Sequence, residues 1–242
     1  MLTENKFSKY LLYAVGEIVL VVIGILLALQ INNWNKQKLN DKLKFEIISE
    51  IKTNLQIDLK ELQDDISYFD SINQYYKDII DYLKINASPN QDFFRLASTL
   101  RLSPHFDANL SGYSLLTSKG VEIISNDSLR KSISILYETK YPYYFKYENE
   151  RIQYRQLYTM PKIEHYFITI PDPKSKYFGD FKISKKDYED LKSDTSFLNM
   201  FNIMIYENSI MIDRAKSTEN DILQLMEQLT KEINTSKLLT KG

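Results

Sequence analysis

Hydrophobic residues follow two different patterns along this chain. Between residues 10 and 31 nearly every position is apolar, with Glu17 as the one charge and no proline. A helix of this length spans about 33 Å, which matches the ~30 Å hydrocarbon core of a bilayer. Tyr10 and Trp34 flank the stretch, where aromatic rings favour the membrane interface. The pattern predicts a single-pass transmembrane helix over residues 10–31, after a basic tail over residues 1–9.

Two other interpretations of this apolar stretch are open. A buried helix of a soluble protein is rarely apolar on every side over such a length. A cleaved signal peptide has a shorter apolar region, of about 7–15 residues, and a small-residue cleavage site that is not evident here. A transmembrane helix explains the stretch better than either.

The lysines around the stretch bear on its orientation. Those that follow it outnumber those before it, namely Lys36, Lys38, Lys42 and Lys44 against Lys6 and Lys9. This count favours a cytoplasmic domain, but domains of about 200 residues translocate largely regardless of charge. A short basic N-terminus before an apolar run is also typical of a signal anchor. We expect an inner-membrane protein with its N-terminus inside and its bulk domain in the periplasm.

Small and polar residues of the stretch share one face of the predicted helix. At spacings of three, seven and four residues, this face carries Ala14, Glu17, Gly24 and Ala28. Small residues let helices approach closely in lipid, and a carboxyl group there is costly unless it faces a partner helix, is protonated or reaches the headgroups. We expect this face to mediate self-association into a homo-oligomer. Alternatively, Glu17 extends to the headgroups and the small residues share a face by chance.

After Trp34, apolar residues recur every three or four positions, which is the period of an amphipathic helix. Three long helices are expected, over about 35–85, 126–167 and 194–233, with short helices near 92–100, 111–120 and after Ser184. We therefore predict an all-α fold in which the transmembrane helix continues into an elongated helical bundle. The domain covers residues 32–236, and a frayed tail covers residues 237–242.

Proline and glycine mark the expected interruptions. Pro142 should kink or break the second long helix, and Pro161 is a second candidate for a break. Residues 171–179, with two prolines and a glycine, are expected to form a loop. Residues 121–124 have strand-like composition, but no partner strand is evident.

The first helix has two faces that point in different directions. Gly24 and Leu55 lie about 220° apart around a straight helix. The self-association face and the bundle-facing side would then be roughly opposite, provided that the helix continues unbroken through residues 32–35.

Composition excludes several kinds of chemistry. The formal net charge is −1, so the chain lacks the basic character of a nucleic-acid-binding domain. The absence of cysteine excludes disulfides, thiolate metal sites and thiol nucleophiles. His105 and His165 are far apart, without a metal-binding pattern around either. We expect no metal, no cofactor and no enzymatic activity.

Acidic residues cluster on the polar faces of the expected helices. General acid–base catalysis needs carboxyl groups in a sheltered pocket. We expect these groups to be solvated instead; they are Glu61, Asp64, Asp65, Glu148, Glu150, Asp187, Glu189 and Asp190.

Tyrosine is concentrated between residues 137 and 158. Tyr buries a large area yet keeps a polar tip, and it is enriched at protein interfaces. One interpretation is a partner-binding surface, formed by Tyr141, Tyr143, Tyr144, Tyr147, Arg151 and Arg155. The other is that these side chains fill the core and rim of the bundle around Pro142.

The segment from Lys9 to Asn35 resembles the hallmark of an uncharacterised bacterial family of single-pass membrane proteins. The matching residues are Gly16, Glu17, Gly24, Ile25, Ala28, Leu29, Asn32 and Trp34. Residues 113–137 resemble, more weakly, a helix–Gly–loop–helix element of the same family. The resemblance implies an N-terminal anchor and a helical extramembrane domain, and it carries no activity, ligand or catalytic residue.

The sequence thus predicts a membrane-anchored structural or interaction protein, held by the lipid bilayer and presenting a surface to a protein partner. The alternative is a membrane-anchored helical sensor that binds a small ligand. No nucleic acid is expected among its partners.

Overall fold

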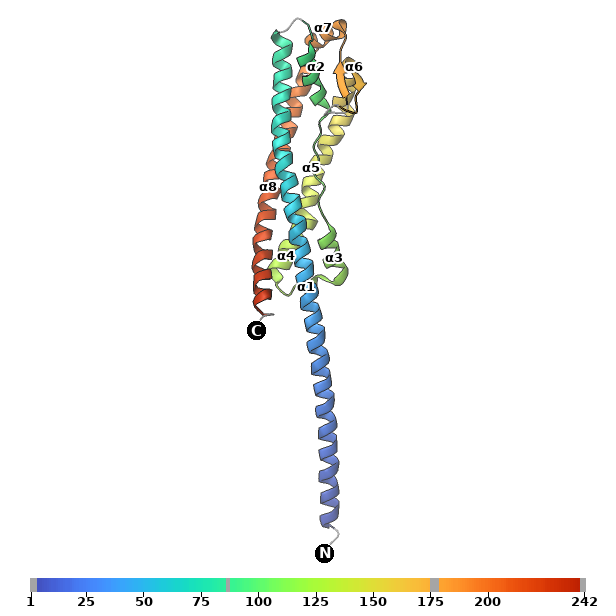
Figure 1. Ribbon diagram of the computed structural model, residues 1–242, viewed down its shortest axis with the longest axis vertical. Helices are drawn as coiled ribbons and strands as arrows, with labels where there is room; N and C mark the ends of the chain where they lie inside the picture. Colours follow the sequence, from blue (N-terminus) through green and yellow to red (C-terminus); the bar gives the residue numbers. More distant parts are fainter. Residues whose placement is uncertain (1–3, 86–87, 175–178, 240–242) are drawn as a thin grey trace.

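The chain folds into a long helical rod with a bundle packed along its C-terminal half (Figure 1). The computed structural model describes residues 4–85, 88–174 and 179–239. Three long helical runs carry the bundle, and the all-α prediction is confirmed. They are α1 (Glu4–Ile85), the run from Asp127 to Tyr166, and α8 (Thr195–Leu239).

Shorter elements connect the long helices. After α1 come α2 (Gln91–Ser98), η1 (Thr99–Arg101), α3 (Ser111–Lys119) and η2 (Val121–Ile123). The second run consists of α4 (Asp127–Ile135), η3 (Leu136–Lys140), α5 (Tyr141–Tyr154), η4 (Arg155–Thr159) and α6 (Met160–Tyr166). Strands β1 (Ile168–Pro171) and β2 (Gly179–Lys182) and helix α7 (Lys185–Ser193) precede α8.

Capping residues set several boundaries where the sequence places them. Asn126 and Ser184 accept hydrogen bonds from backbone N–H groups at the starts of α4 and α7. Asp194 does the same for the first turn of α8. Gly120, with φ +93°, ends α3 in a backbone conformation that favours glycine.

The helix termini extend further than expected. Helix α1 begins at Glu4, inside the predicted tail over residues 1–9, and α8 continues to Leu239, inside the predicted tail over residues 237–242. The rest of both predicted tails, residues 1–3 and 240–242, lies outside the described residues.

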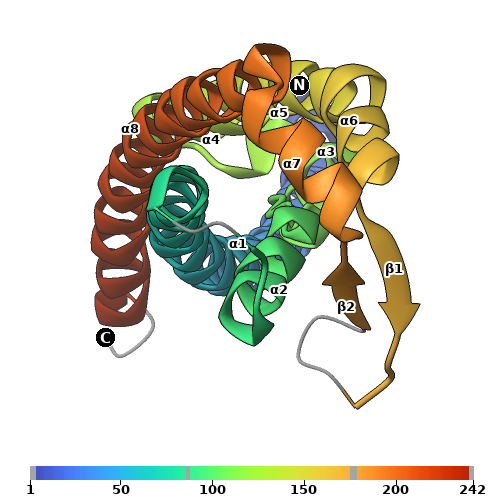
Figure 2. The same cartoon turned by 90° about the horizontal axis from the view of Figure 1, so that it is seen from above.

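Helix α1 packs on the bundle through a strict three–four repeat. Every position of this repeat from Ile48 to Leu83 is buried, as in one helix of a coiled coil. Two of these positions are Asp58 and Asp65. Helix α8 runs antiparallel beside α1, and α3 and α2 also pack on α1 (Figures 1 and 2). The exposed side of α1 carries Thr53, Lys60 and Ser67.

The core divides into two clusters along the rod. One surrounds Ile51, Phe106 and Leu225 near the base of the bundle, where α1 enters it. The other surrounds Tyr76, Phe93 and Phe201 at the far end. Together they fill the bundle from base to tip, with buried polar residues such as Asn73, Arg151 and Arg155 beside them.

The two prolines of the second run do not break it. Each is preceded by a π-helical turn, η3 before Pro142 and η4 before Pro161. The residue before each proline, Tyr141 or Met160, donates its backbone N–H to the carbonyl five residues earlier. The wider turn accommodates the proline, which cannot donate a backbone hydrogen bond.

The predicted loop over residues 171–179 is bordered by a small hairpin. Strands β1 and β2 pair antiparallel, with Ile168 opposite Lys182. The backbone N–H of Phe181 donates to Ser98 Oγ at 3.0 Å, which fixes β2 to α2. Part of the expected loop, residues 175–178, lies outside the described residues. The strand-like residues 121–124 form a 3₁₀ turn instead of a strand.

Candidate functional site: the bare segment of α1 and the base of the bundle

Residues 9–42 of α1, which we call the bare segment, contact no other part of the described chain. All residues from 9 to 42 are exposed, including Tyr10 at 73% and Trp34 at 64%. Over this length the helix extends about 50 Å from the bundle. Its apolar window is the one candidate membrane span among the described helices, by length and composition. An exposed apolar surface of this size is typical of a site that contacts a membrane or another protein.

The predicted self-association face lies within this bare segment. A Cβ added at Gly24 would have no neighbour within 4 Å, so the face is open to a second helix. Ala14, Glu17 and Ala28 are exposed as well. Helix α1 is continuous through residues 32–35, and the condition for the two opposite faces of α1 is therefore met.

Residues 32–42 of α1, which we call the stalk, are exposed and join the apolar stretch over residues 10–31 to the bundle. Lys38 lies over the Trp34 ring, 5.5 Å from its centroid, and Gln37 donates to Asp41 at 3.1 Å. These local contacts keep polar side chains along the helix surface immediately after the apolar stretch.

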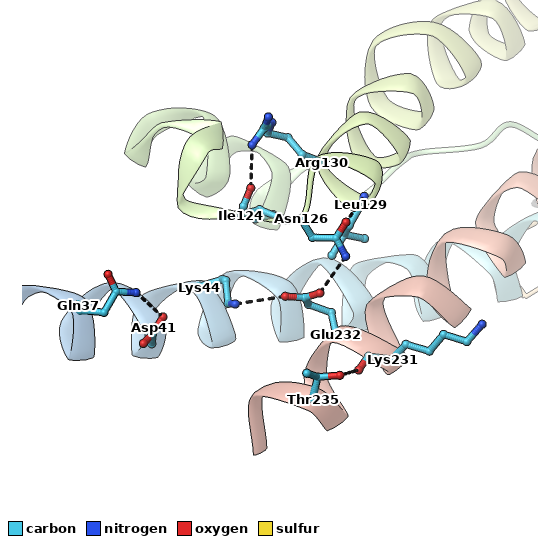
Figure 3. Close-up of polar contacts among 10 residues, drawn as sticks. All are labelled: Gln37, Asp41, Lys44, Ile124, Asn126, Leu129, Arg130, Lys231, Glu232 and Thr235. Atoms are coloured by element: carbon cyan, nitrogen blue, oxygen red, sulfur yellow. Dashed lines mark hydrogen bonds and ion pairs between the residues drawn. The ribbon is translucent and has the colours of Figure 1, made fainter. Parts of the chain in front are cut away.

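The base of the bundle is held by Glu232 of α8 (Figure 3). Its carboxylate accepts from Lys44 Nζ on α1 at 3.2 Å and from Asn126 Nδ2 at the start of α4 at 3.1 Å. The Lys44 and Glu232 side chains are each 15% exposed, so this ion pair is better shielded than a surface pair. It fixes the end of α8 and the start of α4 to α1, where the stalk enters the bundle.

Polar side chains inside the bundle hold an extended segment, residues 102–110. Asn54 and Asp58 of α1 accept from the backbone N–H groups of Gly112 and Asn109, both at 2.9 Å. Glu61, one turn further, accepts from Asp107 N at 3.1 Å. Backbone N–H groups must find acceptors when buried, and here side chains of one helix replace a neighbouring strand.

Helix α5 completes this arrangement from the other side. Glu148 accepts from Phe106 N at 2.9 Å, and Arg151 donates to Pro104 O. In the next turn, η4, Arg155 donates to Leu100 O at 2.6 Å. Burial raises the pKa of Glu148 and lowers the pKa of both arginines. These charged groups hold residues 100–106 in place through hydrogen bonds to their backbone.

Four of the six residues predicted for a partner surface are therefore not available to a partner. Tyr141 and Tyr144 are each 1% exposed, and Arg151 and Arg155 are buried as well. Tyr141 donates its hydroxyl to Asp58 Oδ2 at 2.7 Å, and burial raises its pKa. These four residues belong to the interior, which corrects the prediction; Tyr143 and Tyr147 remain at the surface.

The solvated carboxylates predicted from sequence include two buried ones. Asp65 and Glu148 are each 6% exposed. Burial, together with the neighbouring carboxylates of Glu61 and Glu148, raises the pKa of Asp65 to about 7. Its Oδ2 atom and the Tyr144 hydroxyl are buried without a hydrogen-bond partner among the described residues. The three–four repeat was the available sequence signal, since it passes through Asp58 and Asp65.

A groove lined by both aromatic and charged side chains lies at the far end of the bundle. Its volume is about 690 Å³, and its lining includes Tyr75, Asp78, Tyr82, Asp92, Arg95 and Asp180. No group of three or more Asp, Glu and His side chains in the described part of the chain is arranged to hold a metal ion.

Comparison with known proteins identifies a family. A model of DUF6090, a family of unknown function, matches residues 17–209. The chain belongs to the DUF6090 family. In this DUF6090 protein the matched region begins at Glu17 and extends into α8, so it includes most of the bare segment and most of the bundle. No characterised protein and no solved structure matches the chain. Membership in DUF6090 confirms the prediction that the chain belongs to an uncharacterised family, and it supplies no activity.

Proposed function

We propose that this DUF6090 protein is a membrane-anchored interaction protein. Residues 10–31 of the bare segment span the inner membrane once, and the stalk connects them to the bundle outside the bilayer. The observation that carries this proposal is the contrast within one helix. Residues 10–31 are apolar and exposed on every side, whereas α1 from Ile48 onward has a regular buried face. Lipid is the environment that suits an uncovered apolar helix of this length.

Self-association follows from the small-residue face of the span. In lipid, helices associate through close packing and polar contacts, and Ala14, Gly24 and Ala28 permit that approach. Glu17 on the same face would then meet its counterpart in the neighbouring copy instead of hydrocarbon. Since this face is roughly opposite the bundle-facing side of α1, two spans can pair without collision of their bundles.

The orientation is proposed to be N-terminus inside, with the bundle in the periplasm and exposed to protein partners there. The signal-anchor arrangement of a short basic N-terminus before the span supports this direction, and a domain of this size translocates largely regardless of its own charges.

A second candidate function is supported by the groove at the far end. A sensor would hold a small ligand there, between α1, α2 and β2. Tyrosine rings beside Asp78 and Asp180 suit a cationic molecule. Such a ligand would raise the unfolding temperature of the full chain, and Asp78→Asn would diminish the rise.

The self-association step is tested by Gly24→Leu in a membrane dimerisation assay with the intact span. We expect loss of most of the signal, because the added side chain separates the helices. Gly16→Leu is the matched control. The face spans about 80° around the helix from Gly24 to Ala14, and Gly16 lies about 80° beyond Gly24 in the opposite direction. An unchanged signal for Gly24→Leu, or an equal loss for both variants, would contradict the proposed face.

A further inference from the structure

Arg214 of α8 lies on a platform of two tyrosines from α5. Its guanidinium carbon is 5.0 Å from the Tyr143 ring centroid and 4.4 Å from that of Tyr147. The two tyrosine hydroxyls are 3.2 Å apart. Stacking on aromatic rings holds a guanidinium in a fixed plane and leaves its N–H donors directed outward within that plane.

The hydrogen-bonding capacity of Arg214 is unused among the described residues. It has no ion pair and no hydrogen bond there, and its Nε is buried without an acceptor. Its two Nη atoms are not among the buried unpartnered atoms, and the residue is half-buried, so these atoms are partly accessible. By contrast, Arg95 pairs with Asp92 at 3.1 Å and Arg130 with Asp127 at 2.6 Å. An arginine held rigid, aromatic on one side and open on the other, is suited to a carboxylate from outside the chain.

Tyrosine side chains continue along the same helix face, on either side of the exposed Glu150. At spacings of four, seven and four residues, this face carries Tyr143, Tyr147, Tyr154 and Tyr158, which we call the tyrosine stripe. The Tyr154 and Tyr158 rings are 5.1 Å apart, and Tyr158 is 57% exposed. From Tyr147 to Tyr158 the stripe runs for about 17 Å, the length of about five extended residues.

We propose that Arg214 and the tyrosine stripe bind a peptide segment of a partner protein in which one carboxylate lies a few residues from an apolar side chain. Glu150 and Glu207, beside the stripe, disfavour a segment with further acidic residues. The partner's carboxylate pairs with the Arg214 Nη atoms, and an apolar side chain a few residues away packs on Tyr154 and Tyr158. The apolar length of the stripe favours a peptide over a free inorganic anion, for which the stacked arginine alone would suffice. Tyr and Arg are the residue types that most often dominate binding energy. This inference rests on the proposed function, that the bundle presents a partner surface.

The test is selection of random displayed peptides on the full chain in lipid nanodiscs. We expect enrichment of sequences with Asp or Glu within five positions of a large apolar residue. Arg214→Gln should weaken their binding at least tenfold. Lys131→Gln, which removes an exposed positive charge on α4, is the control and should leave binding unchanged.

A second variant covers the case in which Arg214→Gln disturbs the fold, as judged by helicity and unfolding temperature. Tyr158→Ala, at an exposed position, should also weaken binding several-fold. Peptides that bind equally to the wild type and to both variants would overturn this site while leaving a partner surface elsewhere. Enrichment of basic or uncharged peptides, no enrichment at all, or full displacement by inorganic phosphate without any apolar preference would overturn the inference as well.

Discussion

At the scale of single residues, Asp65 is the most consequential side chain of the interior. It lies on the buried repeat of α1, and burial and two neighbouring carboxylates raise its pKa to about 7 from an ordinary value near 3.8. In the unfolded chain the carboxyl group loses its proton at a lower pH than in the folded protein. The contribution of Asp65 to stability is therefore fully present below about pH 4 and is lost as the pH rises toward 7.

We predict that Asp65→Asn stabilises the protein at pH 8 by about 2–4 kcal/mol, since each unit of pKa shift corresponds to about 1.4 kcal/mol. The gain should be smaller at pH 5, where folded Asp65 is already protonated. Denaturant unfolding of the full chain in detergent micelles at both pH values measures this. Asp64→Asn is the control, because Asp64 is exposed. Equal effects of the two substitutions would contradict the account.

At the scale of elements, α3 is positioned by a close approach to α1. A Cβ on Gly112 would stand 2.7 Å from the backbone nitrogen of Ile51 and 2.9 Å from its side chain. Backbone atoms in the middle of a long helix cannot move aside without disturbing the contacts around them.

An approach this close to backbone should cost about 2–3 kcal/mol in overpacking, whereas alanine contributes up to roughly 1 kcal/mol in helix propensity. Gly112→Ala should therefore destabilise the bundle by about 1–2 kcal/mol. Thermal unfolding followed by circular dichroism measures the loss. Gly16→Ala, where a Cβ meets nothing within 4 Å, should leave the unfolding temperature unchanged. A neutral or stabilising Gly112→Ala would show that α3 does not pack on α1 this closely.

The sequence predicts most element boundaries, because they depend on local chemistry. Asn126, Ser184 and Asp194 cap helices with their own side chains, and Gly120 ends one through its backbone. The π-helical turns before Pro142 and Pro161 were not predicted, since a helix break and a widened turn can each accommodate a residue that lacks a backbone N–H. Hairpin β1–β2 was also not predicted, because its position depends on a contact with α2, which is distant in the sequence.

The candidate site could be predicted only in part, because periodicity does not distinguish neighbouring positions of a helix. Apolar periodicity alone places Leu59 and Ile66 on the buried face, yet Asp58 and Asp65 occupy it and the two apolar residues are half-buried. Buried carboxylates become acceptable only when a distant segment supplies donors, as Asn109 does for Asp58. Arg151 and Arg155 were assigned to a surface for the same reason, because their acceptors are backbone carbonyl groups 47 and 55 residues away in the sequence.

At the scale of the whole molecule, the bundle and the C-terminal end of α8 lie on the same side of the proposed span. The Lys44–Glu232 ion pair places the last turns of α8 beside α1 just beyond the stalk. A reporter fused after Gly242 therefore reports the location of the bundle. We predict that a reporter active only in the periplasm is active there, and that one active only in the cytoplasm is silent. The reverse result would invert the orientation.

The account depends most on the claim that residues 10–31 lie in lipid, and the absence of cysteine makes that claim directly measurable. Single cysteines placed from residue 9 to residue 42, spin-labelled in vesicles, report accessibility to oxygen and to a water-soluble nickel chelate. We predict high oxygen and low chelate accessibility over residues 10–31, with both reduced at Ala14, Gly24 and Ala28, and high chelate accessibility beyond Lys36. Chelate accessibility throughout the stretch, or low accessibility to both reagents on every side of the helix, would contradict a membrane span.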